Sequence, residues 1–125
     1  MLEVWIRCDW EKEDWMSPSG KRWGGLDIAE VTEDQDGITV YINKEPDVLL
    51  EFPKRNPKFD SGEMMSTIQK RFFATIYLYA IAMYFEMKAD SEKRDWAIPT
   101  SMRAISKFIL DLAFTSRGVE QISDD

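Results

Sequence analysis

The sequence predicts an α+β fold, in which a small, mostly antiparallel sheet packs against a long central helix and a C-terminal helix. Two patterns predict it. Apolar residues alternate with polar ones in three short runs before residue 44, and they recur at helical spacing after residue 60. The length of 125 residues fits one domain. We place that domain at 1–118 and expect the acidic residues 119–125 to form a frayed tail.

Three runs in the first half are typical of strands. They span residues 3–10, 26–32 and 38–43. Asp36-Gly37 between the second and third runs predicts a hairpin, because both residues tolerate positive φ. The irregular polar segment 11–25 is expected to be a loop. The inward positions of the first run are expected to be Val4, Ile6, Cys8 and Trp10.

The connection to the helices carries turn signals. Residues 44–47 are expected to form a turn, and 48–52 either a short strand or a helical turn. Residues 53–60 contain two prolines and are expected to be a loop.

Helical spacing then predicts two helices. The long helix should span about 61–88, and Asp60 with Glu63 fits a capping box at its start. A charged connection at 89–98 should lead to a helix at about 99–117, with Pro99 in its first turn. Gly118 should end it.

Composition excludes several kinds of chemistry. The chain has no histidine and one cysteine, Cys8, so disulfide scaffolds, Cys/His zinc sites and imidazole-based catalysis lack their residues. The acidic run ending at Gly37 fails the calcium-loop pattern, since Thr32 and Asn43 occupy its first and last positions. The net charge of -7 argues against nucleic-acid binding. We therefore expect no enzymatic activity, no metal and no cofactor.

The chain also shows no targeting or membrane signal. No basic start followed by an apolar run opens it. Its longest uncharged, mostly apolar run is the 14 residues 72–85, whereas a bilayer span needs about 20. Together with the single cysteine, these features favour the reducing cytoplasm and no membrane attachment.

The run 72–85 is the most informative stretch, because apolar residues occur all round the predicted helix. One small sheet and one further helix would cover only part of it. We expect a second copy of the chain, or another protein, to cover the rest. The alternative is that the tryptophan-rich loop before residue 26 wraps it. The predicted interface residues are Phe73, Tyr77, Tyr79, Ile81 and Tyr84.

A second candidate surface combines aromatic and acidic residues of the first half. Its members are Trp5, Trp15, Glu30, Glu33, Asp34 and Asp36. The carboxylates among them would also suit a small acidic inhibitor, or a nucleic-acid mimic of a mobile element, that binds a basic site.

A third alternative is a small-ligand binder with an aromatic pocket. Trp10, Trp23 and tyrosines of the long helix would line it. Its polar groups would be Asn43, Arg71 and Glu86.

Two segments carry a resemblance to a known group of proteins. They are GITVYINKEPDVLLEF at 37–52 and STIQKRFFATIYLYAIAMYF at 66–85. Their order resembles the regions beyond the catalytic part of bacterial defence-type proteins, which carry a gyrase, histidine-kinase and heat-shock-type ATPase or a subtilisin-like protease. The matching positions are Ile38, Tyr41, Ile42, Asn43 and the helix from Ser66. The resemblance implies an accessory or assembly segment without catalytic residues.

These observations together predict a non-catalytic interaction module that self-associates, as a dimer, through the helix over 72–85.

Overall fold

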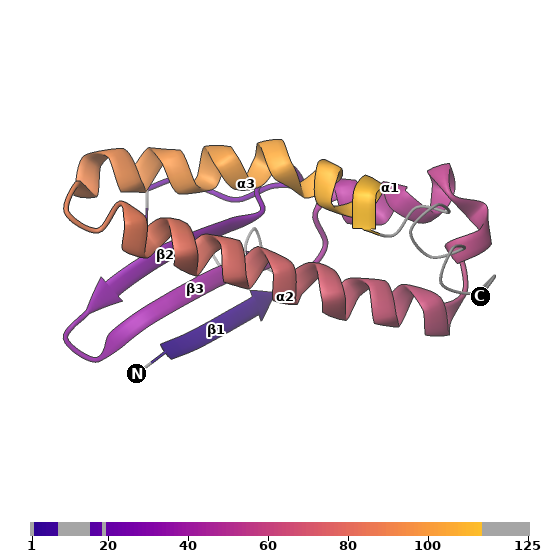
Figure 1. The fold of residues 1–125 in the computed structure, drawn as a ribbon, viewed down its shortest axis with the longest axis horizontal. Coiled ribbons are helices and arrows are strands. Elements are labelled where there is room, and N and C mark those ends of the chain that lie inside the picture. The colour runs from indigo at the N-terminus through magenta and orange to yellow at the C-terminus, as the bar shows by residue number, and fades with distance from the viewer. Residues whose placement is uncertain (1, 8–15, 19, 114–125) are drawn as a thin grey trace.

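The computed structural model describes residues 2–7, 16–18 and 20–113 (Figure 1). These residues form a three-stranded sheet, three α-helices and one short 3-10 helix, which confirms the predicted α+β fold. The predicted tail at 119–125 lies outside them. In chain order the elements are β1 (Leu2–Arg7), β2 (Ala29–Asp34), β3 (Gly37–Asn43), α1 (Asp47–Arg55), η1 (Pro57–Phe59), α2 (Gly62–Glu86) and α3 (Ser91–Ala113).

The sheet has the strand order β1-β3-β2 and is mixed. Strands β2 and β3 form the predicted antiparallel hairpin, with Val31 opposite Val40. Strand β1 joins the other side of β3 in parallel, with Val4 opposite Val40. One of the two pairings is therefore parallel where we expected a mostly antiparallel sheet. The long segment between β1 and β2 makes this possible, because a parallel connection needs about a dozen residues or more.

The hairpin turn is held by a side chain. The Asp34 carboxylate accepts hydrogen bonds from the backbone N–H groups of Asp36, at 2.8 Å, and Gly37, at 3.2 Å. Gly37 has a φ of 139°, a value that glycine adopts without a Cβ penalty. The turn therefore depends on the acidic residue before it as well as on the glycine after it.

Helix α1 corrects the prediction of a loop at 53–60. It continues through Pro53 to Arg55, and η1 follows. Leu49, Phe52 and Phe59 are buried, so helix formation here places apolar side chains in the core. Pro53 has no N–H to donate to the Leu49 carbonyl, so α1 forms despite the loss of one hydrogen bond.

Helix α2 agrees with the prediction to within two residues at each end. Its N-cap is Ser61, whose hydroxyl accepts a hydrogen bond from the Met64 N–H at 3.1 Å. Asp60, the predicted cap, lies one residue too early. With 25 residues, α2 is about 37 Å long and runs along most of the molecule (Figure 1).

Helix α3 begins eight residues before the predicted start at Pro99. The predicted charged connection at 89–98 is therefore wrong, and most of it is helix. The Asp90 carboxylate caps α3 by accepting from the Lys93 N–H at 3.0 Å. Pro99 lies inside the helix, although a proline there removes one hydrogen bond. The burial of Ala97 and Ile98 accounts for helix before the proline.

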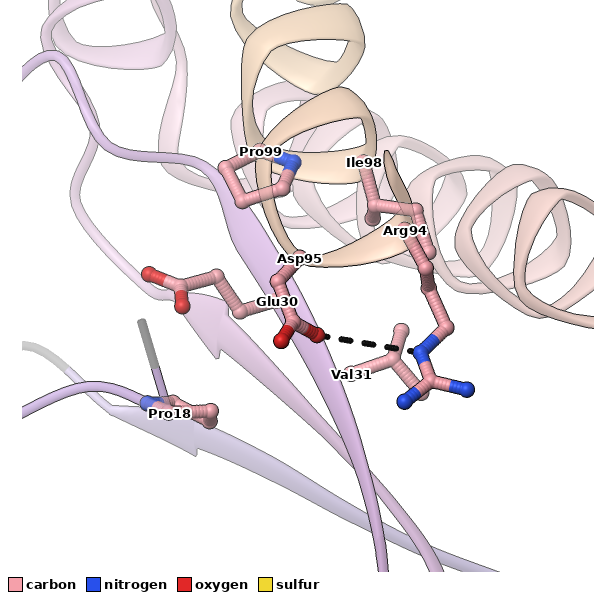
Figure 2. A pocket seen from close by; sticks show the side chains of 7 residues that line it. All are labelled: Pro18, Glu30, Val31, Arg94, Asp95, Ile98 and Pro99. Atoms are coloured by element: carbon pink, nitrogen blue, oxygen red, sulfur yellow. Dashed lines mark ion pairs between the residues drawn. The ribbon is translucent and has the colours of Figure 1, made fainter. Parts of the chain in front are cut away.

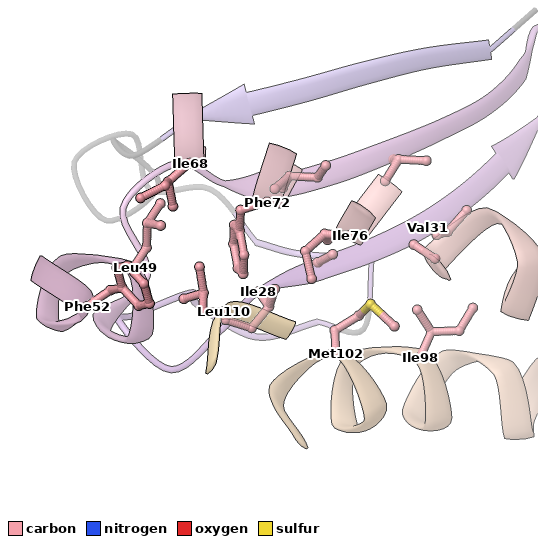
Figure 3. Close-up of a cluster of buried hydrophobic side chains, with 14 of the residues drawn as sticks. Ile28, Val31, Leu49, Phe52, Ile68, Phe72, Ile76, Ile98, Met102 and Leu110 are labelled. Atoms are coloured by element: carbon pink, nitrogen blue, oxygen red, sulfur yellow. The ribbon is translucent and has the colours of Figure 1, made fainter. Parts of the chain in front are cut away.

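Helices α2 and α3 lie side by side and antiparallel, and both contact the sheet (Figure 1). Helix α1 packs against the far half of α3. Their apolar side chains meet in one cluster, seen from close by in Figure 3. The residues of α2 in it are spaced by four: Ile68, Phe72, Ile76, Ala80 and Tyr84. Opposite them lie Val31, Val40, Ile42, Ile98, Met102 and Leu110. No helix in the described part is long and apolar enough to cross a membrane.

The central position of Phe72 leads to a test of this core. Its side chain has no exposed surface, so we expect Phe72→Ala to lower the free energy of unfolding by about 3–5 kcal/mol. Urea unfolding followed by circular dichroism would measure it. The same change at exposed Phe108 on α3 is the control and should cost less than about 1 kcal/mol. Equal losses from both variants would contradict the described core.

Candidate protein-interaction surface

Helix α2 presents an apolar face to solvent as well as one to the core. We call this face the outer row; it consists of residues spaced by four, and all of them are exposed. Leu78, at its centre, is 65% exposed. It follows Ile76 by two residues, so it points about 200° round the helix from the core. The members of the outer row are Lys70, Ala74, Leu78, Ala82 and Glu86.

The outer row is unusual in its chemistry for a solvent-facing helix. No charged residue occurs between Arg71 and Glu86. Exposed helix faces in globular proteins normally carry charged and polar residues. On this face two alanines flank Leu78 instead, and the charges stand only at the ends. An exposed apolar surface with a charged rim is typical of a protein-interaction site.

Two aromatic residues widen this surface. Tyr79 is 51% exposed and Phe85 is 56% exposed. Three further predicted interface residues, Phe73, Tyr77 and Ile81, are half-buried and pack against the core cluster. Tyr79 is thus the most exposed of the predicted interface residues.

Tyr84 belongs to the core rather than to the interface we predicted. Its side chain is fully buried, and its hydroxyl donates a hydrogen bond to the Glu33 carboxylate on β2. The Arg94 guanidinium lies 4.8 Å from the centre of its ring. Tyr84 therefore joins α2 to β2 and α3, and no partner can reach it while these elements stay packed.

Of the four predicted acidic residues, Glu30 is buried, whereas Glu33, Asp34 and Asp36 are exposed. Glu30 is buried and accepts a hydrogen bond from the Trp23 indole at 2.5 Å. Glu33 lies on the opposite face of β2, since its position differs from that of Glu30 by three, an odd number. Its carboxylate accepts a hydrogen bond from the Tyr84 hydroxyl and lies 3.5 Å from the Lys88 ammonium. Asp34 holds the hairpin turn, and Asp36 is exposed beside it.

The predicted aromatic residues at the start of the chain are only partly described. Trp15 lies outside the described residues, as do Cys8 and Trp10. Trp5 is half-exposed on β1, and its ring meets the Tyr41 ring edge-on at 5.5 Å. Its strand neighbours Val4 and Ile6 were expected to face inward, but each is 40% exposed, because α2 and α3 pack mainly against β2 and β3.

The predicted aromatic pocket is not formed by the residues the structure describes. Trp23 is buried against Glu30, and the Asn43 amide donates to the backbone carbonyls of Gly24 and Asp27. Both side chains therefore hold the fold. Arg71 and Glu86 are 15 residues apart on α2, or about 22 Å along the helix.

Two hollows elsewhere are too small or too open to suggest a ligand. The first has a volume of about 10 Å³, enough for one water molecule (Figure 2). Its lining is Pro18, Glu30, Val31, Arg94, Asp95, Ile98 and Pro99. The second is a shallow depression of about 240 Å³ beside the exposed Trp96.

A polar anchor between the N-terminal loop and α3 escaped the sequence analysis. The buried Asp27 carboxylate contacts the Arg103 guanidinium and the Lys21 ammonium, the latter at 2.7 Å. It also accepts the Gly24 N–H at 2.8 Å. Burial raises the pKa of Asp27, while the Gly24 hydrogen bond lowers it. These contacts attach the loop to α3. Asp27 and Arg103 are 76 positions apart, and no sequence pattern predicts that they pair.

The most exposed residues of the candidate surface, Leu78 and Phe85, were absent from the predicted interface. A signal for them exists. Once Ile68, Phe72 and Ile76 are taken as one buried line, Leu78, two residues after Ile76, must point outward. Phe85 follows Leu78 by seven residues and so lies on the same side of the helix.

No set of three or more Cys, Asp or Glu side chains within the described residues is placed to hold a metal ion. Comparison with known proteins finds no family model that matches the chain, no matching curated protein and no matching solved structure.

The Tyr84–Glu33 contact leads to a pH prediction. Burial and the hydrogen bond to Glu33 raise the pKa of Tyr84 to about 12. The unfolded chain should release this proton near pH 10, so stability is lost as the pH rises from about 10 to 12. Tyr84→Phe should remove the part of this alkaline loss that comes from Tyr84, while the raised pKa of Tyr41 leaves a remainder. Chemical unfolding across this pH range would measure it, and an unchanged profile would contradict the contact.

The Glu33 carboxylate leads to a second pH prediction, for acidic solution. The hydrogen bond from the Tyr84 hydroxyl lowers the pKa of Glu33. Desolvation raises this pKa, and the nearby Lys88 ammonium lowers it further. The ionised Glu33 carboxylate therefore stabilises the fold at pH values above the usual glutamate pKa. This stabilisation is lost as the pH falls through the lowered pKa of Glu33 in the folded chain. Glu33→Gln should flatten this acid-side loss and let Tyr84 ionise at a lower pH, as followed by tyrosinate absorbance. A Tyr84 titration identical to that of the unmodified chain would contradict it.

Proposed function

We propose that this protein is a non-catalytic interaction and assembly module, which self-associates as a dimer through the outer row of α2. One observation carries the proposal: Leu78 is 65% exposed at the centre of a helix face without charge from 72 to 85. Tyr79 and Phe85 enlarge that face, and tyrosine is enriched at protein interfaces.

The available apolar surface is large enough to support association. Leu78, Tyr79 and Phe85 are each more than half exposed, so burying one of them would contribute about 1–2 kcal/mol. A dimer contributes six such side chains. Association costs at least about 4 kcal/mol of translational and rotational freedom. The difference favours a dimer of moderate affinity.

The alternatives have less support. An acidic inhibitor would need accessible carboxylates on one face, but Glu30 is buried and Glu33 is engaged by Tyr84. A ligand pocket would need convergent polar groups, and the proposed ones are structural or far apart. An assembly role is compatible with the resemblance to accessory regions of defence-type proteins. We also propose a cytoplasmic location.

Leu78 provides the direct test. Leu78→Asp places a charge at the centre of the outer row, so we expect the solution mass to fall from dimer to monomer at micromolar concentration. Light scattering at two concentrations and two salt levels would measure the mass. Circular dichroism should show an unchanged helix content, since Leu78 does not reach the core.

Leu26→Asp is the matched control. Leu26 is 70% exposed, on the loop before β2, so this variant carries the same change on another surface. It should keep the dimer mass. A monomeric unmodified chain, or a dimer that survives Leu78→Asp, would overturn the proposal.

A further inference from the structure

We propose that the partner of the outer row is a second copy of the chain, packed antiparallel, with Lys70 of each copy opposite Glu86 of the other. This inference rests on the proposed function and specifies its geometry. The two α2 helices cross at Leu78, which lies beside its own equivalent at a two-fold axis.

The outer row is symmetric about Leu78 in a way that suits such an axis. Lys70 and Glu86 each stand eight residues from it, or about 12 Å along the helix. Ala74 and Ala82 each stand four residues from it. A two-fold axis through Leu78 brings each member of these pairs opposite the other on the second copy. The same surface then serves both subunits, as a two-fold interface requires.

The charges select the antiparallel direction. Lys70 and Glu86 are both exposed, and neither forms an ion pair with any residue that the structure describes. An antiparallel pair places Lys70 opposite Glu86 twice. A parallel pair would place lysine against lysine and glutamate against glutamate. Arg71, also exposed, adds positive charge at the Lys70 end.

The spacing also fits a known packing class. Residues four apart drift by about 40° per step round a helix, so the outer row runs obliquely along α2. Two such rows lie along each other when the helices cross at about 50°, the commonest class in globular proteins. Alanine on both sides of Leu78 lets the two backbones approach to about 8–10 Å. The crossing keeps the charged ends within reach of each other.

Two single charge reversals test this arrangement. Lys70→Glu places a glutamate at both ends of the row, and Glu86→Lys places a lysine at both ends. Each variant alone would then bring like charges together twice. We expect each to raise the dimer dissociation constant about tenfold, with the effect shrinking as salt is added.

Mixing the two variants is the decisive measurement. An acidic-ended chain opposite a basic-ended chain makes both contacts attractive again, so the mixture should recover the affinity of the unmodified dimer as a heterodimer. Sedimentation or light scattering of each variant and of the mixture would show it. Lys107→Glu, an equal charge change on exposed α3, is the control and should leave the dissociation constant unchanged.

The outcomes separate this inference from the proposed function. If Leu78→Asp dissociates the dimer but the charge reversals leave its affinity unchanged, α2 mediates assembly in another arrangement and this inference is wrong. If each reversal strengthens the dimer or leaves the mixture as weak as its components, the antiparallel pairing is also wrong. A monomeric unmodified chain would overturn both.

Discussion

The fold depends on one line of side chains, spaced by four along α2, that fills the space between the sheet and α3. Phe72, Ile76, Ala80 and Tyr84 have no exposed surface, and each contacts the common core cluster. Because these residues occupy only one side of the helix, the position of every other residue of α2 follows from them. The outer row is exposed for the same geometric reason that the inner line is buried.

This constraint explains why α2 looks apolar all round in the sequence yet has two different roles. Burial of one set of apolar residues offsets the conformational entropy lost on folding, while Leu78, Tyr79 and Phe85 remain more than half exposed. Half-buried residues such as Tyr77 lie between the two sets and contact the core from the flank. A chain that needed only a stable fold could carry lysine or glutamate in place of Leu78 at no loss of packing.

The sequence predicted the fold class, the hairpin and α2 well, because each has a strong local signal: alternation, a turn residue and helical spacing. It failed where the burial of apolar side chains outweighs a local rule. Pro99 was taken as a helix start, yet α3 begins at Ser91, since Ala97 and Ile98 pack in the core before it. Pro53 likewise lies inside α1. Tyr84 was assigned to an interface because α2 looks apolar all round in the sequence. It is buried because it continues the line of Phe72, Ile76 and Ala80, and its hydroxyl bonds to Glu33, 51 residues away.

The remaining alternative for the exposed face was cover by the N-terminal loop, and the described part of that loop is engaged elsewhere. Trp23 is buried against Glu30 of β2, and Asp27 contacts Arg103 of α3. Asn43 of β3 binds the same segment through the carbonyls of Gly24 and Asp27. Two of these contacts, from Trp23 to Glu30 and from Asn43 to Asp27, are buried, and breaking either would leave an unpaired group away from water. Residues 20–28 are thereby tied to β2, β3 and α3, and the charge pattern at the ends of the outer row favours a second α2 as its cover.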